Sequence, residues 1–500
     1  MARGRQTYKF SRFARGLNTA DGVFGLREGY EDDPQGLGSE ARALMNVVSR
    51  HRGNVSKRDG SIQFATNGSV TYKDFSVIGS EASSFAVLST TGGALYAVSA
   101  AGTATSLVAS GLSASAKWIF LRHPVSGSSG PAFGMNGTDT PRETDGTGAG
   151  TGNWTATTGT VPNGTIMEYH ANTLWVAGVA ATPYSLFWNL VGDPLNWPAA
   201  NVTKFNPDDG QAITALRSID SYLLVFKERG IWRVYNEETS ANAKFADNVG
   251  TRSPRSVVAS PVGCFFLDSQ RGVHVTDGNT VTPISAQIQP TLDAITDSDL
   301  PEVTGAYWQG HYYMSAKVSG VRYVFDYDTE LHSWWIHSPT MFALNVWDQG
   351  SDVQLFGVPD ASGGAIWQMF KSGELRDNGT IFESYWSGPF HAFGTPHLRK
   401  RCNELHVDAR GKANIYVATD YDASFGSLEA NASFSAADTA FGGSGTFGGL
   451  AGTFGGGGAV GEDWLYSLGV GRSWSLTFYS AAEDAWEMDA YTMLMTARRD

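Results

Sequence analysis

Short apolar runs separated by polar turns recur along the middle of the chain. In residues 212–235, two such runs flank Asp220-Ser221, and a charged turn then leads into Ile231–Tyr235, whose side chains alternate in character. A period of two is typical of a half-buried β-strand. The segment therefore predicts three antiparallel strands in a meander. An isolated meander of this length cannot bury both of its faces, so it needs neighbours.

The same unit recurs along the sequence. The first apolar run of successive units begins near residues 70, 117, 165, 212, 256, 303 and 342. Most units also carry a fourth extended segment after the hairpin, such as 103–110 or 330–338. Four strands per unit, at a spacing of about 39–48 residues, are typical of β-propeller blades. We therefore predict an all-β chain with a seven-bladed propeller over residues 67–375. Two stacked β-sandwiches are the alternative.

The blade spacing ends after Lys371. Residues 376–500 contain separate strand-like segments, which predict a C-terminal β-sandwich. Residues 1–66 are expected to supply an N-terminal arm and one or more strands to it, so that the propeller is an insertion. Residues 424–461 are a Gly/Phe-rich insert within the sandwich. This insert is either a mobile loop or a segment that orders on assembly, with Phe447 and Phe454 as anchors.

Composition narrows the classes of function. Hydrophobic residues make up 42% of the 500, which is enough for a core. The net charge is 36 − 49 = −13, so tight binding to DNA phosphates is not expected, although DNA could slide past such a surface. No apolar run is long enough for a transmembrane helix. The basic N-terminus lacks the apolar middle of a signal peptide, so we expect the protein to be synthesised in a cytoplasm. Cys264 and Cys402 are predicted to be buried free thiols.

The N-terminus is basic. Arg3, Arg5, Arg12 and Arg15 all precede Asp21, the first acidic residue. Such an arm can grip an acidic neighbouring subunit or nucleic acid, and we favour a protein neighbour. A solvated terminus is the alternative. The candidate subunit contacts are therefore these four arginines, together with the two phenylalanines of the Gly/Phe-rich insert.

The sequence contains no recognisable catalytic constellation. HExxH, GxSxG and P-loop motifs are absent, and two GxGxxG matches in the Gly-rich tract lack the strand and helix that a nucleotide site needs. His332 and His337 are interpreted as polar strand-edge residues. The carboxylate pairs are interpreted as turn residues, although Asp326 and Asp328 could bind a cation or serve as a glycosidase acid and base. We predict no enzymatic activity, no cofactor and no metal site.

Three groups of residues carry a resemblance to a known family. They are Asn46-Val47 with Arg52–Gly60; Gly192–Trp197 with Asp209–Leu216, Leu223–Lys227 and Gly230–Trp232; and Tyr327-Asp328 with Ser333–Trp335. In these residues the chain resembles the propeller-bearing tail hub or nozzle proteins of tailed bacteriophages. The motifs are blade hairpins and turns, so they indicate a fold family more directly than a function.

The resemblance implies a homohexameric ring in the virion tail, around a channel through which double-stranded DNA is ejected. Portal, adaptor and other tail proteins would be its partners, with tail fibres as further candidates. An acidic channel wall repels phosphates, so DNA would meet few adhesive contacts. Two other classes of function stay open. One is a carbohydrate- or receptor-binding propeller of the virion or cell surface, and the other is a lyase or glycosidase that uses Asp326 and Asp328.

Overall fold

The computed structural model describes residues 5–21, 26, 38–50, 53–68, 70–79, 83–123, 131–220, 222–235, 238–350, 352–360, 363–420, 430–435, 444–447, 450–453, 461–483 and 485–497. The chain divides into two compact units. One comprises Met1–Gly60, Asp326–Ser338 and Ser372–Asp500, and the other comprises Ser61–Phe325 and Pro339–Lys371. Strands dominate both. Among the described residues the helical segments are short, namely α1 (Gln289–Leu292), η2 (Pro207–Asp209), η3 (Pro254–Ser256), η4 (Ala286–Ile288) and η5 (Leu300–Glu302).

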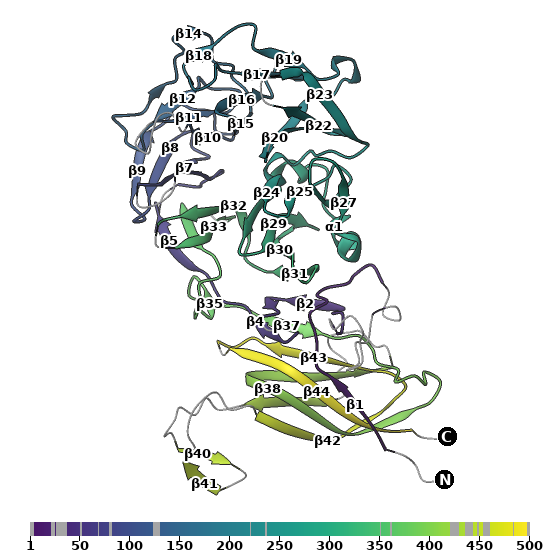
Figure 1. The fold of residues 1–500 in the computed structure, drawn as a ribbon. Coiled ribbons are helices and arrows are strands. Elements are labelled where there is room, and N and C mark those ends of the chain that lie inside the picture. The colour runs from purple at the N-terminus through teal and green to yellow at the C-terminus, as the bar shows by residue number, and fades with distance from the viewer. Residues whose placement is uncertain are drawn as a thin grey trace. The chain divides into compact units, whose positions relative to one another are not determined.

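Seven four-stranded sheets of the described residues follow one another in a ring (Figure 1). Blade one is β6 (Ser76–Ile78), β7 (Phe85–Ser89), β8 (Leu95–Ser99) and β9 (Ala104–Val108). Blade two is β10 (Ile119–Arg122), β11 (Ala132–Met135), β12 (Arg142–Thr144) and β13 (Gly152–Asn153). Blade three is β15 (Ile166–His170), β16 (Thr173–Ala177), β17 (Ser185–Trp188) and β19 (Val202–Lys204). Blade four is β20 (Ile213–Ile219), β21 (Tyr222–Lys227), β22 (Gly230–Tyr235) and β23 (Glu238–Asp247).

The remaining blades keep the same order of strands, from the innermost outward. Blade five is β24 (Val258–Ser260), β25 (Gly263–Leu267), β26 (Val273–Thr276) and β27 (Val281–Pro283). Blade six is β28 (Thr304–Trp308), β29 (His311–Val318), β30 (Val321–Asp328) and β31 (Ser333–His337). Blade seven is β32 (Met341–Asp348), β33 (Val353–Pro359), β34 (Ala365–Gln368) and β5 (Ile62–Thr66). The predicted seven-bladed propeller is thereby confirmed, and the alternative of two stacked sandwiches is wrong.

The ring is closed by a strand from the N-terminal part of the chain. β5 pairs with β34 so that Ala65 lies opposite Ile366, and the inner strands β32 and β6 are in contact. The sequence predicts that residues 1–66 join the C-terminal domain, and the position of β5 corrects this prediction for residues 61–66. β5 is therefore the outermost strand of blade seven, and its pairing with β34 joins the two ends of the propeller segment.

Large aromatic side chains pack between adjacent blades, as predicted. Trp175 and Trp188 of blade three share one buried cluster with Trp232 of blade four. Trp347 of blade seven packs in another cluster with Phe75, which precedes the inner strand of blade one. Burying one large apolar side chain contributes about 1.5–3 kcal/mol. The blades are therefore held to one another mainly by these apolar layers.

The other unit is built from strands of both chain ends, which form a nearly closed, barrel-like sheet. Its longest strand is β38 (Lys400–Thr419). The first half of β38 pairs with β42 (Gly461–Gly471) and β44 (Trp486–Ala497), and its second half pairs with β39 (Ala430–Ser435) and β43 (Trp474–Ser480). One strand therefore belongs to both parts of the sheet.

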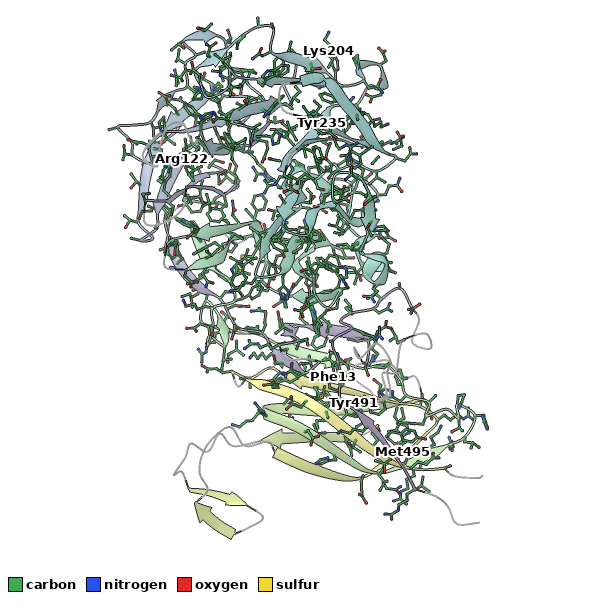
Figure 2. The ribbon with its side chains drawn as sticks, in the orientation of Figure 1. Phe13, Arg122, Lys204, Tyr235, Tyr491 and Met495 are labelled. Carbon is green, nitrogen blue, oxygen red and sulfur yellow. The ribbon has the colours of Figure 1, made fainter. Side chains whose placement is uncertain are left out.

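N-terminal strands complete this sheet, which confirms that expectation. β1 (Arg5–Phe10) and β4 (Val55–Lys57) pair with the free side of β44, and β3 (Val47–Val48) pairs with β4. On the other side, β37 (Ser384–Ser387) pairs with β43, and β2 (Ala43–Met45) pairs with β37. Phe13 lies beside Tyr491 in the core, with ring centroids 5.8 Å apart (Figure 2).

In the described part of the chain, three short strand pairs lie outside these sheets. β14 (Thr158–Gly159) pairs in parallel with β18 (Asn196–Trp197). β35 (Arg376–Asp377) and β36 (Thr380–Ile381) form one hairpin, and β40 (Ser444–Phe447) and β41 (Leu450–Thr453) form another. The second hairpin lies in the Gly/Phe-rich insert, so part of that segment adopts β structure.

Candidate functional site: the axial cavity of the propeller

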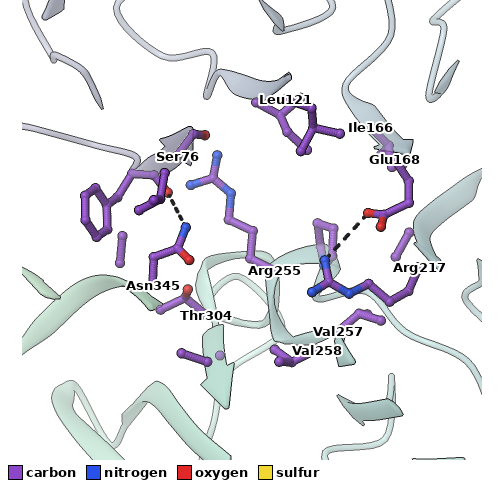
Figure 3. A pocket seen from close by; sticks show the side chains of 18 of the residues that line it. Ser76, Leu121, Ile166, Glu168, Arg217, Arg255, Val257, Val258, Thr304 and Asn345 are labelled. Atoms are coloured by element: carbon purple, nitrogen blue, oxygen red, sulfur yellow. Dashed lines mark hydrogen bonds and ion pairs between the residues drawn. The ribbon is translucent and has the colours of Figure 1, made fainter. Parts of the chain in front are cut away.

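A cavity of about 400 Å³ lies where the inner strands of all seven blades meet. One residue from each blade illustrates the lining: Ser76, Leu121, Glu168, Arg217, Val258, Thr304 and Asn345 (Figure 3). A volume of this size is at the lower end of the range for small-molecule pockets. The cavity is therefore the candidate binding site of the propeller.

Some polar groups of the lining connect neighbouring blades. The Ser76 hydroxyl of blade one accepts a hydrogen bond from the Phe120 backbone N–H of blade two, at 3.3 Å. The Asn345 amide of blade seven donates to the Phe75 carbonyl, also at 3.3 Å, beside blade one (Figure 3). Each such bond satisfies a backbone group at the crowded centre of the ring. The Ser76 and Asn345 side chains therefore form hydrogen bonds within the propeller itself.

An ion pair joins blades three and four at the cavity. Glu168 Oε2 lies 3.6 Å from Arg217 Nη1, and Glu168 Oε1 accepts a hydrogen bond from the Ser218 backbone N–H at 3.4 Å. The Glu168 side chain is only 15% exposed. Burial raises the pKa of this carboxyl group above its usual value, and Arg217 opposes the rise.

Arg255 makes a contact of a different kind. It lies in η3, just before the inner strand of blade five, and its Nη2 donates to the Trp118 carbonyl of blade two at 3.3 Å. Blades two and five are not neighbours in the ring, so the contact spans the axis. Burial lowers the pKa of the Arg255 guanidinium, and Asp74 and Glu302 oppose this effect.

A second contact between non-neighbouring blades lies near the first. Lys117, just before the inner strand of blade two, forms an ion pair with Glu302, just before that of blade six. Burial lowers the pKa of the Lys117 ammonium group, and Arg255 lowers it further. Asp74 accepts hydrogen bonds from the backbone N–H groups of Ser89 and Trp118. This end of the cavity is therefore crossed by fixed polar contacts.

Three of the four arginines predicted as subunit contacts, Arg5, Arg12 and Arg15, lie among the described residues and make side-chain or backbone contacts within their own unit. Arg5, 66% exposed, has Nη1 3.9 Å from Glu404 Oε1. The Arg12 carbonyl accepts a hydrogen bond from the Ser39 N–H at 2.8 Å, and Arg15 Nε donates to the Gly38 carbonyl at 2.8 Å. Their role as contacts between subunits stays a prediction.

The other predicted contact residues lie at or beyond the edge of the described structure. Arg3 and Phe454 lie outside the described residues. Phe447 is the last residue of β40, where its backbone lies opposite Leu450 in the hairpin. Their role as anchors between subunits also stays a prediction.

Asp326 and Asp328, the candidate glycosidase carboxylates, have different structural roles. Asp326 Oδ2 lies 3.3 Å from Nε2 of His337, and both side chains are buried. Asp328 Oδ1 instead accepts hydrogen bonds from the backbone N–H groups of Glu330 and Leu331, at 2.8 and 2.9 Å. The interpretation of Asp328 as a turn residue is confirmed. His337 is the last residue of β31, the outermost strand of blade six, so its interpretation as a strand-edge residue is confirmed, and its side chain is buried against a carboxylate.

Residues that carry the family resemblance organise turns and buried contacts. Arg58 is 1% exposed, and its Nε and Nη1 donate to Asn46 Oδ1 at 2.9 Å and to Asp377 Oδ1 at 3.0 Å. Gly60 lies so close to backbone that an added Cβ would be 2.1 Å from the Arg376 carbonyl oxygen. In the second motif, Trp197 Nε1 donates to the Pro194 carbonyl at 3.0 Å and closes the turn.

Sequence reasoning missed the charged residues of the cavity. Glu168 and Arg217 each interrupt the first apolar run of a blade, and this position within an inner strand is the signal that could have identified them. Arg255 precedes such a run and has no comparable signal. Both cysteines are buried and free, as predicted, and burial raises the pKa of each thiol to about 12.

Among the described residues, no three or more His, Cys, Asp and Glu side chains gather in a group that could hold a metal ion. The helices of the described part of the chain are too short to cross a membrane. No protein-family model matches the chain, and no curated protein matches its sequence.

Proposed function

We propose that the protein is a structural component of a bacteriophage tail, of the hub or nozzle type, and that six copies form a ring around the channel for the genome. In this proposal the chain catalyses no reaction. Its partners are further copies of itself, the portal or adaptor and other tail proteins, and its location is the tail of the virion.

The observation that carries the proposal is the way the chain is divided. A seven-bladed propeller is inserted into a second all-β unit that both chain ends build. The resemblance to hub and nozzle proteins implies the same arrangement, a propeller together with a second β domain. Arg58 and Gly60, which belong to the resembling residues, fix contacts within the second unit.

The axial cavity constrains where DNA could pass. A space of about 400 Å³ accommodates a small molecule but no duplex, and contacts of Arg255 and Lys117 span it. The proposed channel therefore lies between copies of the chain, on the axis of the ring. Such a closed ring of one chain requires complementary heterologous interfaces.

Electron microscopy of the purified full-length chain tests the proposal. We expect ring-shaped particles with sixfold symmetry and an open centre, alone or after addition of a phage portal protein. A chain that stays monomeric under both conditions contradicts the proposal. As a control for non-specific association, the chain with Arg58→Met should yield fewer rings, because its second unit is destabilised.

A receptor- or carbohydrate-binding propeller is the second candidate, and one surface feature favours it. Tyr222 and Tyr235 lie at the same end of blade four with ring centroids 4.8 Å apart, and Tyr235 is exposed. Exposed tyrosines offer rigid amphipathic contact area. Binding on a glycan array that Tyr235→Ala abolishes would support this function.

A further inference from the structure

The Arg255 guanidinium has few partners for a charged group in a cavity. Of its five N–H donors, the described residues engage one, in the 3.3 Å bond to the Trp118 carbonyl. Among the described residues, no carboxylate oxygen lies within 4.0 Å of it. Figure 3 shows the side chain extending into the cavity toward Ser76. Four donors of a rigid fork are thus free to receive an oxyanion.

The charges around the cavity leave Arg255 without a dedicated counterion. Arg217, Arg255 and Glu168 are the charged residues of the lining, and Glu168 already pairs with Arg217. Glu302 and Asp74 act on Arg255 from outside the lining, but both have other partners. The residues that line the cavity therefore carry one excess positive charge, 2 − 1 = +1, and Lys117, Asp74 and Glu302 behind the lining contribute 1 − 2 = −1 from a greater distance.

The rest of the lining suits the organic body of a small ligand. Val77, Leu121, Tyr307 and Val346 line the cavity and are partly exposed, so they offer apolar surface beside the polar groups. Pockets for small molecules combine such apolar walls with a few convergent polar groups. A volume of about 400 Å³ is suited to a molecule of the size of a monosaccharide.

We infer that the axial cavity is a binding site for a small organic anion, of monosaccharide size, whose carboxylate or phosphate group pairs with Arg255. The ligand's body lies against Leu121 and Tyr307, and its hydroxyl groups reach the ion pair of Glu168 and Arg217. This site belongs to a single propeller. It is therefore independent of whether the chain assembles into a ring.

Calorimetric titration of the full-length chain with glucuronate, glucose 6-phosphate and glucose tests the inference. We expect at least one of the two anions to bind with a Kd below about 1 mM, and glucose to bind much more weakly. Binding of glucuronate alone identifies a carboxylate ligand, and binding of glucose 6-phosphate alone identifies a phosphate. If neither anion binds, or if glucose binds equally well, the inference is wrong.

Variants assign the binding to Arg255. Arg255→Gln should weaken binding of the anion by about 10- to 100-fold, which corresponds to the loss of a charge-assisted hydrogen bond. Arg229→Gln, which removes an exposed guanidinium from a turn of blade four, is the matched control and should bind as the wild type does. Equal binding by wild type and Arg255→Gln contradicts the inference.

Thermal unfolding separates a ligand site from a structural brace. Removing a poorly paired buried charge should leave the Tm of unliganded Arg255→Gln unchanged or raise it. The anion should raise the Tm of the wild type and of Arg229→Gln but not that of Arg255→Gln. A Tm of unliganded Arg255→Gln well below that of the wild type would instead make Arg255 a brace between blades two and five, and would refute the inference.

Discussion

At the scale of single residues, Arg58 gives the sharpest test of how the second unit is held together. It is 1% exposed and pairs with Asp377, whose side chain is 12% exposed. Arg58→Met should lower the free energy of unfolding by about 3 kcal/mol, because it leaves the largely buried Asp377 carboxylate without its ion-pair partner and removes one hydrogen bond from Asn46 Oδ1. Denaturation by guanidinium chloride, followed by tryptophan fluorescence, measures this loss.

Arg50 provides the matched control for that substitution. It also pairs with an aspartate, Asp59, at 2.8 Å, but its side chain is 42% exposed. Arg50→Met should therefore cost less than about 1 kcal/mol. Equal losses for the two variants would show that the burial of Arg58 contributes nothing beyond a surface ion pair.

Residues differ in how far their environment follows from the sequence. The burial of Cys264 and of the blade tryptophans could be predicted because each lies in an apolar run that a strand must bury. The roles of Arg58 and Arg255 could not. Arg58 lies 319 positions from Asp377, and the partner of Arg255 belongs to a blade on another side of the ring. Contacts between residues this far apart in the chain produce no local sequence pattern from which they could be predicted.

At the scale of elements, Gly411 marks the point where β38 passes from one part of the sheet to the other. It lies opposite Trp486 at the end of the pairing with β44, and pairing with β39 begins at the next residue. Its φ is +80°, and an added Cβ would lie 1.9 Å from the Ala485 carbonyl oxygen. Both the backbone conformation and the close approach therefore require glycine here.

Gly411→Ala can be compared with Gly379→Ala to separate these two requirements. Gly379 also has a φ of +80°, but nothing lies within 4 Å of its added Cβ. Both variants bear the cost of a left-handed conformation, about 1–2 kcal/mol. Because Gly411→Ala also displaces backbone, we expect its Tm to fall clearly further than that of Gly379→Ala. Equal shifts in thermal unfolding would show that the Ala485 carbonyl moves aside at no cost.

Most strands could be predicted because their spacing along the chain is regular. The inner strands begin close to the predicted positions, for instance β10 at Ile119 and β28 at Thr304. The assignment of β5 failed for a physical reason. A strand with alternating side chains can pair with the edge of either β unit. Residues 62–66 join the propeller because β34 offers them an unpaired side, which the sequence of β5 itself does not reveal.

At the scale of the whole molecule, net charge sets a condition on assembly. Each copy carries −13, so six copies would bring together 6 × (−13) = −78 charges. Such a ring has to overcome mutual repulsion at long range. Arg5 has a carboxylate partner within its own unit, which reduces its capacity to offset the charge of a neighbour.

Salt therefore distinguishes two ways of holding a ring together. The screening length falls from about 30 Å at 0.01 M salt to about 8 Å at 0.15 M, which weakens repulsion between copies. We expect the fraction of rings, counted by mass photometry, to rise over this range, because apolar and backbone contacts are insensitive to screening. Because Arg5 already pairs with Glu404 of its own unit, we expect Arg5→Glu to lower that fraction no more than Arg229→Glu, which adds the same charge on the propeller. This outcome would contradict the sequence-based prediction that Arg5 contacts a neighbouring subunit. A fraction that falls as salt is added, together with selective loss in Arg5→Glu, would show instead that the N-terminal arm holds the neighbouring copy through ion pairs.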